Sequence, residues 1–247
     1  MKKFNLYLFT AAFASVFAFS SCLGDSDDSN YPAYRNVGVT VGSGGFRMLA
    51  DNGSYLVPTT MVSGLENVER AAISFDLASG ELAELKPGKS YDVIINTAYS
   101  YVIPTYSVID LKDNAVAVDS LVNSQTEVTR VNGMYAVNGY MTMEATLPCD
   151  YSTQPTVDVA YNSAEDIDVQ GEKLTLTLYY DAKSSYAPQT VSSIFSFRLP
   201  ASAATAFYEN QTDSIELVLN YQTSIGAMDS GTTSCRMAVK DLQRAYF

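Results

Sequence analysis

Residues 173–180 read Lys173-Leu174-Thr175-Leu176-Thr177-Leu178-Tyr179-Tyr180, an alternation of polar and apolar side chains that ends in two tyrosines. Successive side chains of a β-strand point to opposite faces, so this pattern predicts a strand with one buried and one exposed face. Other runs rich in Val, Ile, Tyr and Phe recur along the chain, separated by Gly, Pro, Asn and Asp. The one predicted helix is short, at residues 201–208. The fold class is therefore predicted to be all-β. The remaining predicted strands are 37–41, 46–50, 54–57, 70–77, 91–103, 106–111, 156–161, 194–199, 214–221 and 235–239. Residues 134–147 are predicted to be short strand runs on either side of Asn138-Gly139.

The strands fall into two groups, which predict two domains. In residues 37–111, Asn52-Gly53 between two apolar runs is a strong hairpin signal, and five or six short strands suit a small barrel. Residues 112–129 are polar, have no sustained period and are predicted to be a linker. In residues 130–247 the strands are longer and predict an antiparallel β-sandwich.

The N-terminus has the layout of a secretory signal peptide. Lys2 and Lys3 precede an apolar run at residues 4–19, and two serines then lead to Cys22. This run of 16 residues is shorter than the roughly 20 that span a bilayer. We predict a signal peptide at residues 1–21. The alternative is an ordinary secretory peptide cut nearby, with Cys22 an incidental thiol.

Residues 22–36 follow the predicted cleavage site. They begin with small and acidic residues that cannot bury apolar surface, so they are predicted to form an acidic flexible tether.

The charge of the chain argues against nucleic acid as a partner. The formal net charge is −12, and removal of Lys2 and Lys3 with the signal peptide makes it −14. Affinity for phosphate backbones depends on Lys and Arg contacts, which such a chain supplies poorly. Anionic lipid headgroups are disfavoured by the same argument.

Histidine is absent from the sequence, and this removes several classes of enzyme. A Ser-His-Asp or Cys-His nucleophile and a histidine-ligated zinc or iron centre are excluded. The glycines of Gly42-Ser43-Gly44-Gly45 lack the Lys-Ser/Thr that a phosphate-binding loop needs, so they predict a turn or bulge. No cofactor is expected, and the chain is predicted not to be an enzyme.

Three sets of residues are candidates for sites. Cys149 and Cys235 are candidates for a disulfide in an oxidising compartment, with two buried free thiols as the alternative. Asp166 and Asp168 are candidate oxygen ligands for calcium, although a solvated acidic loop explains them as well. Tyr179 shares a strand face with two threonines and is the candidate for an exposed aromatic platform, although most tyrosines of this chain are expected to be core.

The sequence Phe19-Ser20-Ser21-Cys22 resembles a loose bacterial lipobox. The resemblance implies cleavage before Cys22 and a lipid on its sulfur. Acidic residues within a few positions of that cysteine resemble the surface-export signal of Bacteroides lipoproteins. That resemblance implies a lipid-anchored protein of the outer membrane that faces the cell exterior.

The two predicted domains together resemble the NigD-like lipoproteins, over nearly the whole mature chain. The first resembles their N-terminal OB-like domain, and the second their C-terminal β-sandwich. The resemblance implies a fold and a location, because the family has no established activity. It is carried by the segments 47–58 (RMLADNGSYLVP), 91–96 (YDVIIN), 138–144 (NGYMTME), 194–199 (IFSFRL) and 215–219 (IELVL).

The expected function is a non-catalytic cell-envelope lipoprotein that serves as a binding or accessory module. Its expected partners are the membrane, through the lipid, and an unidentified envelope or extracellular protein or glycan. One alternative is a bacteriocin-related immunity or protective lipoprotein. A third hypothesis is a glycan hydrolase with two catalytic carboxylates, but the sequence identifies no such pair of residues.

Overall fold

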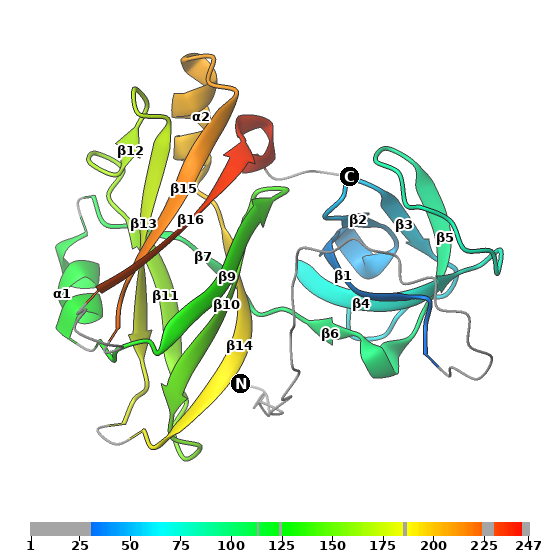
Figure 1. The fold of residues 1–247 in the computed structure, drawn as a ribbon, viewed down its shortest axis with the longest axis horizontal. Coiled ribbons are helices and arrows are strands. Elements are labelled where there is room, and N and C mark those ends of the chain that lie inside the picture. The colour runs from blue at the N-terminus through cyan, green and yellow to red at the C-terminus, as the bar shows by residue number, and fades with distance from the viewer. Residues whose placement is uncertain (1–30, 113, 124, 185–186, 224–229, 244–247) are drawn as a thin grey trace.

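A computed structural model describes residues 31–112, 114–123, 125–184, 187–223 and 230–243. The predicted signal peptide, Cys22 and the first part of the predicted tether lie outside these residues. The all-β prediction is confirmed, and two domains lie side by side (Figure 1). No helix among the described residues combines the length and apolar character that a membrane crossing requires.

The first domain is a closed barrel of five strands with an additional edge strand. Two short 3-10 helices, η1 and η2, lie in its loops. The bounds are β1 (Tyr34–Val41), η1 (Ser43–Gly45), β2 (Met48–Ala50), β3 (Tyr55–Pro58), β4 (Arg70–Leu77), β5 (Ser90–Ile95), η2 (Thr97–Tyr99) and β6 (Tyr101–Val102).

The barrel closes in the order β1-β2-β3-β5-β4 and back to β1. Strands β3 and β5 pair in parallel, and the other neighbours are antiparallel. This closed barrel agrees with the small barrel of five or six strands predicted for the first domain. The hairpin predicted at Asn52-Gly53 is confirmed, because β2 and β3 pair through Met48 and Leu56.

One predicted strand of this domain is wrong. Residues 91–103 form β5, η2 and β6 instead of a single strand. The Asn96 side chain accepts a hydrogen bond from the Ala98 N–H at 3.1 Å, and the Ser100 hydroxyl donates to the Asn96 carbonyl at 2.7 Å. Such local side-chain bonds compete with the strand ladder and turn the chain.

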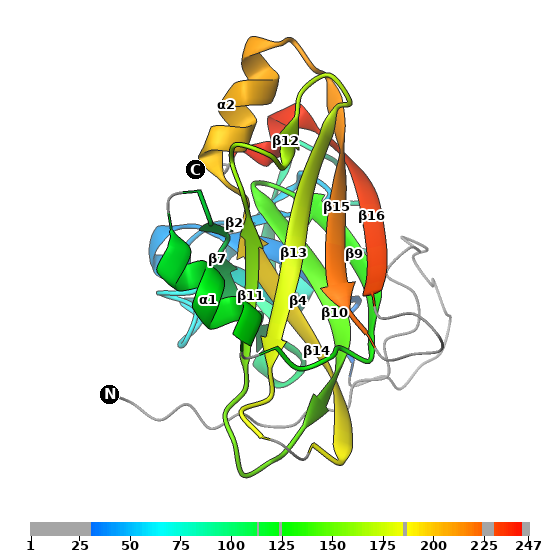
Figure 2. The same cartoon turned by 90° about the vertical axis from the view of Figure 1, so that its left-hand side faces the viewer.

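The second domain is a sandwich of a four-stranded and a larger sheet. Two helices and a 3-10 helix accompany the sheets, and α2 lies at one end of the sandwich (Figure 2). The four-stranded sheet contains β7 (Thr105–Ser107), β14 (Gln189–Arg198), β10 (Tyr140–Cys149) and β9 (Arg130–Val137). The larger sheet contains β16 (Ser230–Ala238), β15 (Ser214–Gln222), β13 (Lys173–Asp181), β11 (Thr156–Tyr161), β8 (Ile109–Asp110) and β12 (Ile167–Asp168). The helices are α1 (Ala115–Asn123), α2 (Ala201–Glu209) and η3 (Val239–Leu242).

The sandwich is mixed and not purely antiparallel as predicted. Strands β13 and β15 are parallel, because the chain crosses to the other sheet as β14 and returns through α2. Strand β7 is parallel to β14, and β8 is parallel to β11. The predicted strand at residues 173–180 is confirmed as β13, and its leucines lie in the core.

The domain boundaries differ from the prediction at two places. Strands β7 and β8 belong to the sandwich sheets, so the barrel ends before Thr105 and not at residue 111. The predicted linker at residues 112–129 contains helix α1. At the other end, Tyr34–Asn36 are part of β1, so the predicted tether to residue 36 is too long.

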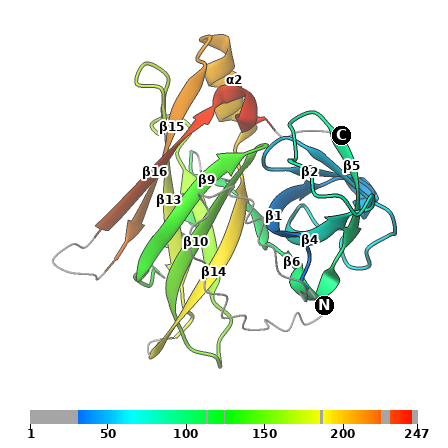
Figure 3. The same ribbon diagram turned by 45° about the vertical axis from the view of Figure 1, so that its right-hand side comes forward.

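Each domain has its own hydrophobic core. Ile73 and Phe75 are among the buried residues of the barrel core, and Leu176 and Phe197 are among those of the sandwich core. The four-stranded sheet faces the barrel, as the rotated view shows (Figure 3). Polar side chains from the two domains meet between the cores, and they form the contact described next.

Candidate functional site

The face of the four-stranded sheet that points away from the sandwich core is polar. Along β10, Met141, Met143, Ala145 and Leu147 point into the core, so the intervening residues point outward. Those outward residues are Tyr140, Thr142, Glu144 and Thr146, with Ser192, Ile194, Ser196 and Arg198 beside them on β14. Tyr140, Thr142 and Ser196 are buried, whereas Glu144 and Thr146 are half-buried and Ser192 is exposed. The barrel therefore covers one half of this polar face and leaves the other half open.

Arg70, the first residue of β4, is at the centre of the covered half. Its side chain is fully buried. Nη1 donates to Asp51 Oδ1 at 2.7 Å and Nη2 donates to Asp51 Oδ2 at 2.9 Å, which makes a bidentate ion pair within the barrel. Nη1 also donates to Thr40 Oγ1 at 3.1 Å. Nε is the one Arg70 nitrogen without a partner among the described residues.

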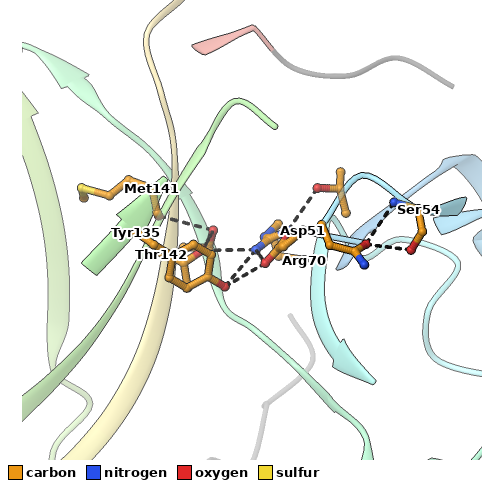
Figure 4. Close-up of polar contacts among 9 residues, drawn as sticks. Asp51, Ser54, Arg70, Tyr135, Met141 and Thr142 are labelled. Atoms are coloured by element: carbon orange, nitrogen blue, oxygen red, sulfur yellow. Dashed lines mark hydrogen bonds and ion pairs between the residues drawn. The ribbon is translucent and has the colours of Figure 1, made fainter. Parts of the chain in front are cut away.

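The same guanidinium reaches across to the sandwich. Nη2 donates to the Tyr135 hydroxyl of β9 and to Thr142 Oγ1 of β10, both at 3.3 Å. The Tyr135 hydroxyl donates in turn to Asp51 Oδ2 at 3.0 Å. Figure 4 shows these side chains converging from the two domains. Arg70, Asp51, Tyr135 and Thr142 are called the junction below.

The ionisation of the junction is determined by burial and by Asp51. Burial by itself lowers the pKa of Arg70, but the charge and hydrogen bonds of Asp51 raise it by more, so the guanidinium stays protonated. Burial raises the pKa of Tyr135, and the nearby carboxylate of Asp51 raises it further. The junction thus contains a buried guanidinium that stays charged and a tyrosine hydroxyl that stays protonated over the ordinary pH range.

A second ion pair joins the domains next to the junction. Arg198 donates from Nε to Glu69 Oε2 at 2.7 Å and from Nη2 to Glu69 Oε1 at 2.6 Å. The Tyr140 hydroxyl donates to Glu69 Oε2 at 3.0 Å. The hydrogen bonds of Glu69, and then its charge, raise the pKa of Arg198. Glu69 and Arg70 are neighbours in sequence, so one short segment supplies both contacts from the barrel.

Gly38 of β1 allows this close approach. A Cβ atom at this position would lie 2.2 Å from Asp51 Oδ2 and 3.1 Å from the Tyr135 hydroxyl oxygen. The first contact is closer than a real Cβ atom comes and the second is tight, so a side chain at this position would displace the Asp51 carboxylate from the junction. A glycine inside a strand often marks such a close approach, and this was the one sequence signal that could have indicated the junction.

Five side chains form a hydrogen-bonded group on the open half of the polar face. Asn132 Nδ2 donates to Glu144 Oε1 at 3.2 Å, to Thr146 Oγ1 at 3.0 Å and to Ser192 Oγ at 3.1 Å. Ser192 Oγ donates to Glu144 Oε1 at 3.1 Å, and Arg130 Nε donates to Asn132 Oδ1. These five residues are called the Asn132 cluster below.

Tyr101 of β6 brings the barrel close to this cluster. Burial, and after it the charge of Glu144, raises the pKa of Tyr101 to about 12. The charge of Glu144, on the sandwich, therefore acts on a side chain of the barrel. The cluster itself offers a carboxylate, an amide, two hydroxyls and a guanidinium.

Of the two alternatives for the candidate cysteines, the structure has the free thiols. Cys149 and Cys235 are free thiols. Cys149 ends β10 next to Pro148, whose carbonyl accepts from the Tyr180 hydroxyl at one end of β13. Cys235 pairs with Leu217, and Leu217 pairs with Leu174 near the other end of β13. Tyr180 and Leu174 are six residues apart along β13, which is about 20 Å of strand. Cys149 lies beside the first and Cys235 beside the second, so they are too far apart for a disulfide.

The other two sequence candidates are in separate places. Asp166 accepts from the Asn162 N–H at 2.7 Å and Asp168 accepts from the Gly171 N–H at 2.8 Å, so both cap turns. No group of three or more His, Cys, Asp or Glu residues that could hold a metal is found in the described part of the chain. The turns that Asp166 and Asp168 cap agree with the alternative given for them, an acidic loop. Tyr179 is half-buried, pairs with Asp158 and lies on the outer face of the larger sheet.

Comparison with solved structures agrees with this architecture. No family model and no curated protein matches the chain. A NigD-like immunity protein from Bacteroides caccae superposes with a TM-score of 0.57 and 17% identity, over 85% of this chain and 99% of that one. This chain has the fold of a NigD-like protein. The resemblance inferred from the strand segments is therefore confirmed at the level of the fold.

Two further structures share the fold. A candidate toxin-related protein from Parabacteroides distasonis has a TM-score of 0.60 and 19% identity, covering 83% of this chain and 93% of that one. A candidate lipoprotein from Bacteroides fragilis has a TM-score of 0.55 and 12% identity, covering 82% of this chain and 96% of that one. At these identities the comparison is informative about the fold only.

Proposed function

We propose that this chain is a non-catalytic lipoprotein of the bacterial outer membrane, attached through Cys22 and facing the cell exterior. In this proposal it acts as a binding or accessory module. The lipobox-like sequence and the acidic residues behind Cys22 support the location. The fold shared with a candidate lipoprotein is compatible with it.

The observation that carries the binding role is the open half of the polar sheet face. The Asn132 cluster is held in place by its own hydrogen bonds and by the strands beneath it. The junction and the Glu69–Arg198 pair hold the barrel in one position beside the cluster. A partner would therefore meet donors and acceptors that are already ordered, which lowers the entropic cost of binding.

The cluster is better suited to binding than to hydrolysis. A glycosidase of the usual kind needs two carboxylates about 5–10 Å apart. Glu144 is the one carboxylate of the Asn132 cluster, and its neighbours are an amide, two hydroxyls and a guanidinium. These groups can exchange their mutual hydrogen bonds for bonds to a hydroxyl-rich glycan or to a protein backbone.

Site-specific photocrosslinking on intact cells tests this role. A photoreactive amino acid at exposed Ser192 reports on the cluster, and the same amino acid at exposed Ser234 of β16 is the matched control on the opposite sheet. We expect a discrete adduct from position 192 that disappears when Asn132→Ala and Glu144→Ala are added. Equal labelling from the two positions would contradict a binding role for this face.

Proteinase treatment of intact cells tests the location separately. The surface proposal predicts that the protein is digested without lysis and that Cys22→Ala releases it from the membrane fraction. Full protection of the lipidated protein would contradict the outward orientation.

An immunity or protective role is the second candidate. The fold shared with a NigD-like immunity protein and with a candidate toxin-related protein favours it. A mature charge of −14 would attract a cationic toxin by long-range electrostatics. Deletion of the gene should then reduce tolerance to the toxin, and lipidated protein should restore it where Cys22→Ala protein does not.

A further inference from the structure

Three side chains pack together where the described chain enters the barrel. The Tyr31 and Tyr99 rings have centroids 5.3 Å apart and are tilted by 58°, and the Arg35 guanidinium lies over the Tyr31 ring, 4.6 Å from its centroid. Tyr31 and Tyr99 remain 52% and 41% exposed. Tyr31, Arg35 and Tyr99 are called the aromatic stack below.

An exposed aliphatic residue lies beside the strand that binds the entering segment. The Ala33 N–H donates to Asp76 Oδ1 at 2.8 Å, which holds the entering segment against β4. Ile94 of β5 pairs with Asp76, and 53% of its surface is exposed. This side of the barrel thus presents two amphipathic rings, an aliphatic side chain and a cation, with the Asp76 carboxylate bound to the Ala33 N–H.

The length of the chain limits how far this surface can be from the lipid. Eight residues separate Cys22 from Tyr31. Fully extended, the nine steps span at most about 30 Å. A lipid on Cys22 therefore keeps the aromatic stack within that distance of the bilayer, and closer for any less extended path.

We propose that the aromatic stack and Ile94 rest on the headgroup region of the bilayer and orient the barrel against the membrane. The proposal depends on the lipid anchor of the proposed function. Tyrosine suits this position because its ring is apolar and its hydroxyl stays hydrated, and arginine extends its charge toward water in the same way. Acyl chains on Cys22 supply the affinity, so the contact determines orientation.

The chemistry of the lipid follows from the charge of the protein. The formal charge of −14 disfavours anionic headgroups, and Arg35 is the cation that the stack itself contributes. A neutral, zwitterionic surface is therefore the expected occupant. The sandwich, with the Asn132 cluster, would then be held in a fixed position relative to the membrane.

The absence of tryptophan from the sequence gives a clean test. Tyr31→Trp introduces a single fluorophore into the stack, and Tyr208→Trp introduces one at a 54% exposed position on α2 in the other domain. Lipidated protein is reconstituted into vesicles of phosphatidylcholine and phosphatidylethanolamine that contain brominated acyl chains. We expect blue-shifted emission that loses most of its intensity to bromine for Tyr31→Trp and none for Tyr208→Trp.

A double variant and a second way of anchoring the protein complete the test. Ile94→Ser with Tyr99→Ser should restore most of the Tyr31→Trp emission while the protein still floats with the vesicles. If Cys22 carries no lipid, the proposed function fails, and an N-terminal hexahistidine segment in its place, bound to nickel-chelating lipid, still tests the contact. Unquenched Tyr31→Trp emission on anchored protein, or a blue shift that depends on protein concentration without vesicles, would overturn the proposal.

Discussion

Arg70 of the barrel and Tyr135 of the sandwich meet at 3.3 Å, and both contact the Asp51 carboxylate. A fully buried guanidinium therefore donates hydrogen bonds to side chains of both domains, and its counterion belongs to its own domain. Replacing one member leaves the others buried without their partner, which costs more than the pair itself contributes.

Arg70→Met should destabilise the protein by about 3–5 kcal/mol and separate the unfolding of the two domains. The methionine fills the space but leaves Asp51 and the Tyr135 hydroxyl without the cation. Urea unfolding followed by circular dichroism measures the effect, and Arg236→Met, at an exposed position of β16, is the control. Adding Asp51→Asn should recover part of the loss, because the uncompensated charge is then removed. Equal stability of Arg70→Met and Arg236→Met would contradict the role of the junction.

Gly38→Ala should disrupt the same contact from the side of β1. The added Cβ would lie 2.2 Å from Asp51 Oδ2, so the carboxylate must move away from Arg70. Overpacking of this kind costs about 1–3 kcal/mol. Gly133→Ala on β9 is the control, because a Cβ at Gly133 meets no atom within 4 Å. The prediction is wrong if the two variants unfold at the same denaturant concentration.

Cys149 and Cys235 should both react with a thiol reagent in denaturant without a reductant. They are free in the structure, and they lie beside residues of β13 that are about 20 Å apart along the strand. The mature chain with Cys22→Ser carries just these two cysteines. In the folded protein both should react slowly, because burial raises the pKa of Cys235 to about 11 and also raises that of Cys149. A protein that reacts only after reduction contains the disulfide.

The stability of the protein should decrease as the pH rises from 10 to 12, with Tyr101 as one cause. Burial and the charge of Glu144 raise its pKa to about 12, above the ordinary value near 10. The folded state then holds a proton that the unfolded state has lost, so stability falls over this window. Tyr101→Phe should make the pH dependence of the unfolding midpoint less steep. An unchanged slope would show that folding does not raise the pKa of Tyr101.

The local features of the fold could be predicted from the sequence. The alternation in residues 173–180, the Asn-Gly turns at residues 52–53 and 138–139 and the short helix near residue 201 all depend on neighbouring residues. The break at Asn96 was missed because its cause, a side chain bound to the backbone two residues on, does not disturb the apolar alternation.

The sequence by itself determined the all-β class, the two domains and the candidate anchor at Cys22, because strand period, turn chemistry and signal-peptide layout are properties of short segments. The tertiary structure alone decided that Asp51 meets Tyr135, 84 residues away, and that Glu69 meets Arg198, 129 residues away. It also decided that the two cysteines stay apart and that half of a polar sheet face remains open. These outcomes depend on how two separately folded cores pack against each other, and no local pattern in the chain records that packing.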